Sequence, residues 1–106
     1  MSIEDVRTFA LSSGDVDERF PFCGFPGAGD TLVFYKGKKT FLYMDLNDCG
    51  HNLTLRCRPE CMEDVLERYA TARRSRHFAG KWLCISADEL EEDVIKQMIK
   101  DSYDMI

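Results

Sequence analysis

The sequence predicts an α+β fold: an antiparallel β-sheet with the N- and C-terminal helices packed together on one face. Strand-like segments follow one another through short turns, which favours antiparallel pairing. Amphipathic helical segments lie before, between and after these strands, and each needs a surface to cover. The chain has 106 residues and 44% hydrophobic content, enough for one domain over residues 1–106 with its own core.

The first helix is expected over about residues 3–12. Ser2 and Asp5 have the spacing of a helix start in which each side chain caps the other's backbone. Gly14 should end the helix. Its buried stripe is made of Val6, Phe9 and Ala10.

Residues 15–30 read as a long connection, because they contain two prolines and three glycines. Three phenylalanines in it indicate that it packs against the body of the protein: Phe20, Phe22 and Phe25.

Three strands are expected next, over about residues 32–35, 40–46 and 52–57, joined by turns at 36–39 and 47–50. In the third of these strands, alternation places one set of side chains inward and the other outward. The inward set is Leu53, Leu55 and Cys57, and the outward set is Thr54 and Arg56.

A second helix should begin at Pro59 and run to about residue 70, followed by a basic irregular segment and a short strand at 82–85. Ser86 and Glu89 have the spacing of a second capping box, which predicts a final helix over 87–103. The order is therefore α-β-β-β-α-β-α, with room for extra short strands, and the far face of the sheet should be partly open.

Several segments, in this order, resemble motifs of the MmcQ/YjbR family. They are Phe20-Pro21-Phe22, the hairpin of residues 32–41, the Asn52-to-Glu60 stretch, the His77-to-Trp82 stretch and Asp101-Ser102-Tyr103. The resemblance implies a fold related to that of bacterial frataxin and a presumed role in DNA binding. Arg58 stands where the family often has an Asp, so the second helix loses a side-chain cap.

The first candidate site is the basic segment around residues 73–82, which contains no acidic residue. Arginines pair with phosphates and an exposed Trp stacks on a base. The competing interpretation is a solvated loop whose arginines pair with acidic helices while Trp82 packs in the core, and we expect that burial. The candidate residues are Arg73, Arg74, Arg76, His77, Lys81 and Trp82.

The second candidate site is the tip of the hairpin, with Lys36, Lys38 and Lys39. Such a tip can contact a phosphate backbone, although lysines also commonly protect a strand edge from pairing. Arg56 and Tyr43 would join the two basic regions if both lie on the open face. Together these residues predict weak nucleic-acid binding, DNA above all, without sequence preference.

Metal binding and catalysis find less support. A frataxin-like metal role would use the acids Glu4, Asp5, Asp15, Asp17 and Glu18, but they are scattered among arginines. Cys49, His51, Cys57 and Cys61 match no usual zinc spacing, and we expect all five cysteines to be free thiols. No nucleophile motif or phosphate loop is present, so no enzyme and no cofactor are expected.

Bulk properties set the remaining expectations. The net charge of −5 opposes nucleic-acid binding, but residues 30–82 carry ten basic and seven acidic side chains. No segment predicts a membrane span or a signal peptide, which favours a cytoplasmic protein, and nothing in the sequence demands more than a monomer. A protein partner meeting the open sheet face and the Phe-rich connection is the main alternative function.

Overall fold

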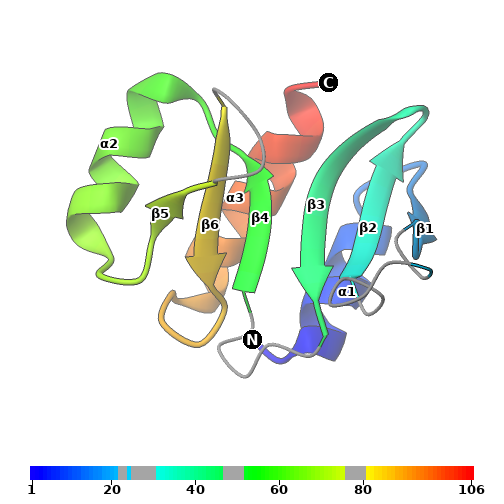
Figure 1. The fold of residues 1–106 in the computed structure, drawn as a ribbon, viewed down its shortest axis with the longest axis horizontal. Coiled ribbons are helices and arrows are strands. Elements are labelled where there is room, and N and C mark those ends of the chain that lie inside the picture. Colours follow the sequence, from blue (N-terminus) through cyan, green and yellow to red (C-terminus); the bar gives the residue numbers. More distant parts are fainter. Residues whose placement is uncertain (22–23, 25–30, 47–51, 76–80) are drawn as a thin grey trace.

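The computed structural model describes residues 1–21, 24, 31–46, 52–75 and 81–106. In this part of the chain there are three helices and six strands: the predicted three helices and four strands in the predicted order, and two further short strands (Figure 1). The elements are α1 (Ile3–Leu11), β1 (Asp17–Arg19), β2 (Thr31–Lys36), β3 (Lys39–Asp45), β4 (Asn52–Arg56), α2 (Pro59–Arg68), β5 (Arg73–Arg74), β6 (Trp82–Ser86) and α3 (Glu92–Asp104).

The strands form one sheet in the order β1-β2-β3-β4-β6-β5, and every neighbouring pair is antiparallel. This confirms the predicted sheet. The added strands β1 and β5 hold the two outer edges. Both are short and mostly exposed, so they lack the alternation of apolar and polar residues that predicts a strand from sequence.

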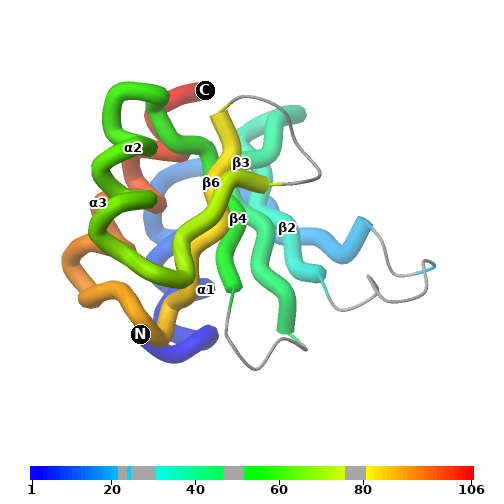
Figure 2. The backbone as a smooth tube through the Cα atoms, turned by 60° about the vertical axis from the view of Figure 1, so that its left-hand side comes forward, coloured from blue at the N-terminus to red at the C-terminus, as the bar shows by residue number. Residues whose placement is uncertain are grey.

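The helices cover one face of this sheet. α1 and α3 pack together behind the central strands, and α2 lies on the same side beyond α3 (Figures 1 and 2). This confirms the predicted arrangement of the terminal helices. In the described part of the chain no helix is long and apolar enough to cross a bilayer.

The core lies between the helices and the inward side chains of the strands. Leu42, Leu55 and Leu83 are cross-strand partners on β3, β4 and β6, and all three are fully buried. Cross-strand partners share a face, so the residues that alternate with them point to the opposite face, where the described chain has no helix.

The helix starts follow the local rules in one case and depart from them in another. At α1, Ser2 and Asp5 form the predicted capping box. The prediction that the final helix begins at Ala87 is wrong: Ser86 instead accepts a hydrogen bond from the Asp88 amide within a turn, and α3 begins at Glu92. The Glu89 carboxylate, expected to cap this helix, accepts hydrogen bonds from Thr71.

Candidate nucleic-acid interface

A single row of residues crosses all six strands on the face away from the helices; one of them, Val33, is fully buried, and the other five are half-buried or exposed. Register pairs connect each strand to the next, and the row spans roughly 24 Å at the usual strand spacing. We call it the cross-strand row; it reads Arg19, Val33, Tyr43, Thr54, Cys84 and Arg73. An exposed arginine therefore stands at each end of the row, on the edge strands β1 and β5.

An arginine and two aromatic rings occupy the middle of the face. The Cζ of Arg56 lies 4.8 Å from the centroid of the Trp82 ring, a cation–π distance. The Tyr43 ring meets Trp82 edge-on at 5.5 Å. All three side chains are half-buried, so they form part of the sheet surface. We call them the Arg56–Trp82–Tyr43 cluster.

Hydrogen bonds to Thr40 fix this cluster. The Nε of Arg56 donates to the Thr40 backbone oxygen at 2.9 Å, which ties β4 to β3 across the face. The hydroxyls of Tyr43 and Thr40 lie 3.1 Å apart. Thr40 therefore holds Arg56 and Tyr43, the two side chains whose contacts with Trp82 make up the cluster.

Ser102 supports the cluster from the helix side. The register skips Phe41 between Tyr35↔Thr40 and Phe34↔Leu42, and β3 and β4 diverge near this point (Figure 1). The buried Ser102 hydroxyl donates to the Phe41 carbonyl at 2.6 Å and accepts from the Arg56 amide at 2.9 Å. A side chain of α3 thus replaces a missing ladder bond between the strands.

A second arginine–aromatic pair lies toward the β1 edge. The Cζ of Arg19 sits 5.0 Å from the centroid of Tyr35, and its Nη2 pairs with Asp17 at 3.2 Å. The open face therefore presents aromatic rings next to guanidinium groups in two places.

A known protein family and a solved structure are similar to this chain. A family model described as YjbR matches residues 11–105. The chain belongs to the YjbR family. The family resemblance seen in the sequence motifs is thereby confirmed. A crystal structure of a Pseudomonas syringae protein is similar over 99% of this chain and 98% of its own, with a TM-score of 0.78 and 18% identity. That likeness concerns the fold, and no curated protein matches the chain in sequence.

Two of the predicted basic site residues in this YjbR-family chain lie away from the open face. Lys36 points to the helix side, where its Nζ donates to the backbone oxygens of Tyr103 and Ile106 at 3.2 and 3.3 Å. The Lys36 Nζ also lies 4.1 Å from the centroid of the Tyr103 ring. It therefore binds the C-terminal end of α3, where a cation is favoured.

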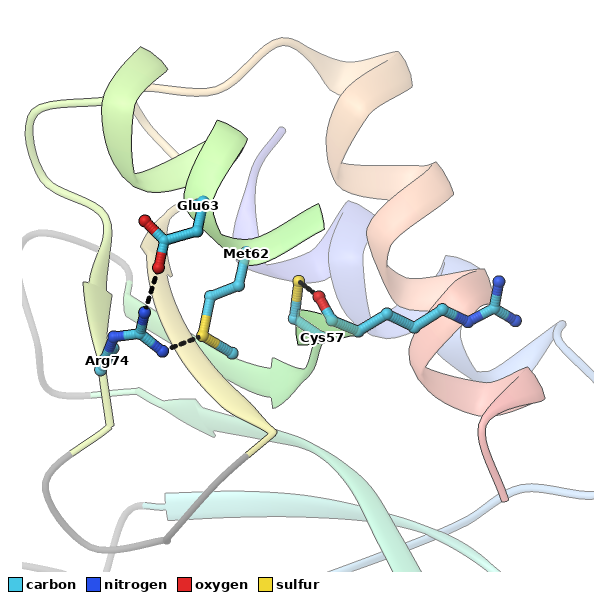
Figure 3. A network of polar contacts seen from close by, with 5 residues as sticks. Cys57, Met62, Glu63 and Arg74 are labelled. Atoms are coloured by element: carbon cyan, nitrogen blue, oxygen red, sulfur yellow. Dashed lines mark hydrogen bonds and ion pairs between the residues drawn. The ribbon is translucent and has the colours of Figure 1, made fainter. Parts of the chain in front are cut away.

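Arg74 also lies on the helix side. Its guanidinium pairs with Glu63 at 2.6 Å and contacts the Met62 sulfur at 2.8 Å, both on α2 (Figure 3). The neighbouring Arg73 is a register partner of Cys84 and faces the other way. The competing interpretation of the basic segment is therefore right for Arg74.

The other predicted residues divide into three groups. Arg56 and Trp82 meet on the open face, and Trp82 is half-buried there, so its expected burial in the core is wrong. Lys38 and Lys39 are exposed at the β2–β3 hairpin, and Lys81 is exposed just before β6. Arg76 and His77 lie outside the described residues.

Sequence reasoning missed Arg19, Tyr35 and Ser102. The signal for Ser102 was present in the Asp101-Ser102-Tyr103 motif, but its partners lie 46 and 61 residues away. Nothing local to Arg19 indicates a strand, so no pattern in the sequence could have placed it on the face.

Three of the acidic side chains considered for metal binding are engaged in other contacts. Asp5 belongs to the capping box of α1, and Asp17 pairs with Arg19. Glu18 accepts two hydrogen bonds from Arg7, which raises the arginine's pKa above its ordinary value.

The described cysteines are free thiols: Cys57, Cys61 and Cys84. Burial, with smaller contributions from Cys61, Asp101 and Glu60, raises the pKa of the Cys57 thiol to about 11. Cys49 and His51 lie outside the described residues, and within those described no three Cys, His, Asp or Glu side chains gather as a metal site.

A shallow pocket of about 440 Å³ lies on the helix side, between α1 and the β1 edge of the sheet. It is bordered by Phe20 and Leu46, the two large apolar side chains of the described chain that are most exposed, at 45% and 40%. The Arg7–Glu18 ion pair forms its polar rim.

Proposed function

We propose that this YjbR-family protein binds nucleic acid weakly and without sequence preference, through the open face of its sheet and without catalysis. The observation that carries the proposal is the cross-strand row with an arginine at each end and the Arg56–Trp82–Tyr43 cluster beside it. Guanidinium groups suit phosphate oxygens, and aromatic faces suit bases.

The distribution of charge over the layers supports binding on this face despite the net charge of −5. The three helices carry ten acidic and four basic side chains. The six strands carry six basic and three acidic ones, of which Lys36, Arg74 and Glu18 lie on the helix side, so the excess of basic groups on the open face is smaller than these totals. Because exposed charges act mainly within a Debye length of ~10 Å, the acidic layer repels a ligand less when it approaches the opposite side.

Contacts of this kind position a phosphate backbone without reading bases in a groove. The described chain has no exposed helix on the open face that could enter a major groove. We therefore expect dissociation constants in the non-specific range of ~10⁻⁴–10⁻⁶ M. The affinity should fall as the salt concentration rises.

The test is a salt-titrated anisotropy assay with labelled duplex DNA, single-stranded DNA and RNA. Arg73→Ala should weaken binding and reduce the salt slope by about one phosphate contact. Arg74→Ala is the matched control, since it makes the same change at the next residue on the other side of the sheet. Equal effects of both variants, or no binding by the wild type at ~50 mM salt, would contradict the proposal.

A protein partner is the second candidate function, and the pocket bordered by Phe20 and Leu46 favours it. Exposed apolar side chains around a concave surface are typical of interaction sites. Failure of all three nucleic acids to bind would make this the leading function.

A further inference from the structure

We infer that the preferred ligand is a single strand, whose unpaired bases stack on the open face between Arg19 and Arg73. The inference rests on the proposed function, and it adds the class of nucleic acid and the manner in which it lies on the protein.

The depth of the aromatic rings is the first argument. Tyr35, Tyr43 and Trp82 are half-buried within the sheet surface. In a duplex the faces of the bases are covered by their neighbours, and only groove edges are open to a protruding element. A base can lie against half-buried rings only after it has left the stack, as in a single strand.

The rigidity of Arg56 is the second argument. Its Nε donates to Thr40, its amide donates to Ser102, and its guanidinium lies against Trp82. A side chain held in this way presents a fixed plane, and guanidinium planes are stacking surfaces for unpaired bases.

The placement of the outer arginines is the third argument. Arg19 and Arg73 are exposed on the two edge strands, roughly 24 Å apart, and the aromatic side chains lie between them. This places charge at the ends and stacking surfaces in the middle. The length suits the lower end of the ~4–16 nucleotides that a comparable sheet-based single-strand site covers.

Charge density is the fourth argument. A single strand carries about half the charge per unit length of a duplex. A protein with a net charge of −5 is repelled less by it, so stacking can supply a larger share of the binding free energy.

The experiment uses Trp82, the only tryptophan of the chain, as a reporter at the site. Its emission is followed while an oligothymidylate of about eight nucleotides is added, and anisotropy of the labelled oligonucleotide is measured in parallel. A duplex of the same length and inorganic polyphosphate, which has charge but no bases, are titrated in the same way. We expect the oligothymidylate to change Trp82 emission and to bind at least tenfold more tightly than the duplex. Polyphosphate should leave the emission unchanged.

Variants of Tyr43 separate stacking from charge. Tyr43→Leu should weaken oligothymidylate binding roughly 5- to 100-fold, the range for removing one stacking ring, and Tyr43→Phe should retain most of the affinity. Tyr69→Leu, on the helix side after α2, is the matched control and should bind as the wild type does. Circular dichroism verifies that each variant is folded.

The outcomes distinguish failure of the single-strand inference from failure of the proposed nucleic-acid binding. Duplex binding as tight as that of the single strand, or unchanged Trp82 emission at saturating oligothymidylate, overturns the single-strand inference and leaves nucleic-acid binding standing. Absence of binding to any nucleic acid overturns the proposed function and the inference together.

Discussion

The guanidinium of Arg56 lies over the indole ring of Trp82, with its Cζ 4.8 Å from the ring centroid. The two residues are register partners on β4 and β6, so the sheet itself brings them together. This pair places a guanidinium group and an indole ring side by side on the outward side of β4 and β6.

Replacing Arg56 with Lys should show how much the guanidinium contributes to stability and to the environment of Trp82. Lys keeps the charge but loses the Nε bond to Thr40 and the planar stack on Trp82. We expect a loss of about 1 kcal/mol in the free energy of unfolding, measured by urea denaturation, with altered Trp82 emission in the folded state. Arg68→Lys, in an exposed ion pair with Asp64 on α2, is the control and should change stability by less than ~0.5 kcal/mol.

Ser102→Ala should be more destabilising than its small change in volume suggests. The substitution leaves the Phe41 carbonyl and the Arg56 amide without their bridging hydroxyl in a buried place. An unsatisfied buried polar group costs about 1–3 kcal/mol. The comparison is Ser12→Ala, which removes an exposed hydroxyl bond to Phe9 at the end of α1. If both variants unfold at the same urea concentration, the hydroxyl does not hold the strands together.

The predictable parts of the fold are those determined by nearby residues. The α1 capping box links Ser2 to Asp5, three positions away, and the alternation of β4 is visible in five consecutive residues. Arg58 was expected to lack a capping bond, and it does. These features depend on local geometry, so sequence patterns report them directly.

The candidate site depends on contacts between residues that are far apart in the sequence, so sequence patterns predict it less well. Arg73 and Arg74 are adjacent and chemically identical; alternation along the strand sends them to opposite faces, and only the register with β6 decides which of them lies on the open face. Strand β1 exists because it pairs with β2, and its three residues have no strand pattern of their own. The Ser86–Glu89 pattern matched a helix cap, but β6 continues to Ser86 and Glu89 is engaged by Thr71.

Substitution by Met should lower the stability of the protein at one lysine of the β2–β3 hairpin and leave it almost unchanged at another. Lys36→Met removes the bonds to the end of α3 and the contact with Tyr103, and we expect a loss of about 1–2 kcal/mol in unfolding free energy with little change in nucleic-acid binding. Lys38→Met, at the exposed tip, should leave stability within ~0.5 kcal/mol of the wild type. A Lys36→Met variant as stable as Lys38→Met would mean that the bond to α3 contributes nothing.

The Cys57 thiol should make the stability of the protein fall at alkaline pH. Its pKa is about 11 in the folded chain, against an ordinary value of 9.0, because burial disfavours the thiolate. The folded state therefore holds this proton more tightly than the unfolded state. Its stabilising contribution is fully present below pH ~9 and is lost as the pH rises toward ~11.

Cys57→Ala isolates this effect from the tyrosines and lysines that titrate in the same range. The variant should be less stable at neutral pH, since a buried side chain is shortened, but its unfolding free energy should fall less steeply between pH ~9 and ~11 than that of the wild type. Cys61→Ala, at an exposed position on α2, should keep most of the wild-type slope, because burial contributes more than Cys61 to the raised pKa of Cys57. Urea denaturation at a series of pH values measures all three proteins. Parallel curves for the wild type and Cys57→Ala would show that the pKa of the Cys57 thiol is the same in the folded and unfolded states, because only a proton bound differently by the two states changes the slope.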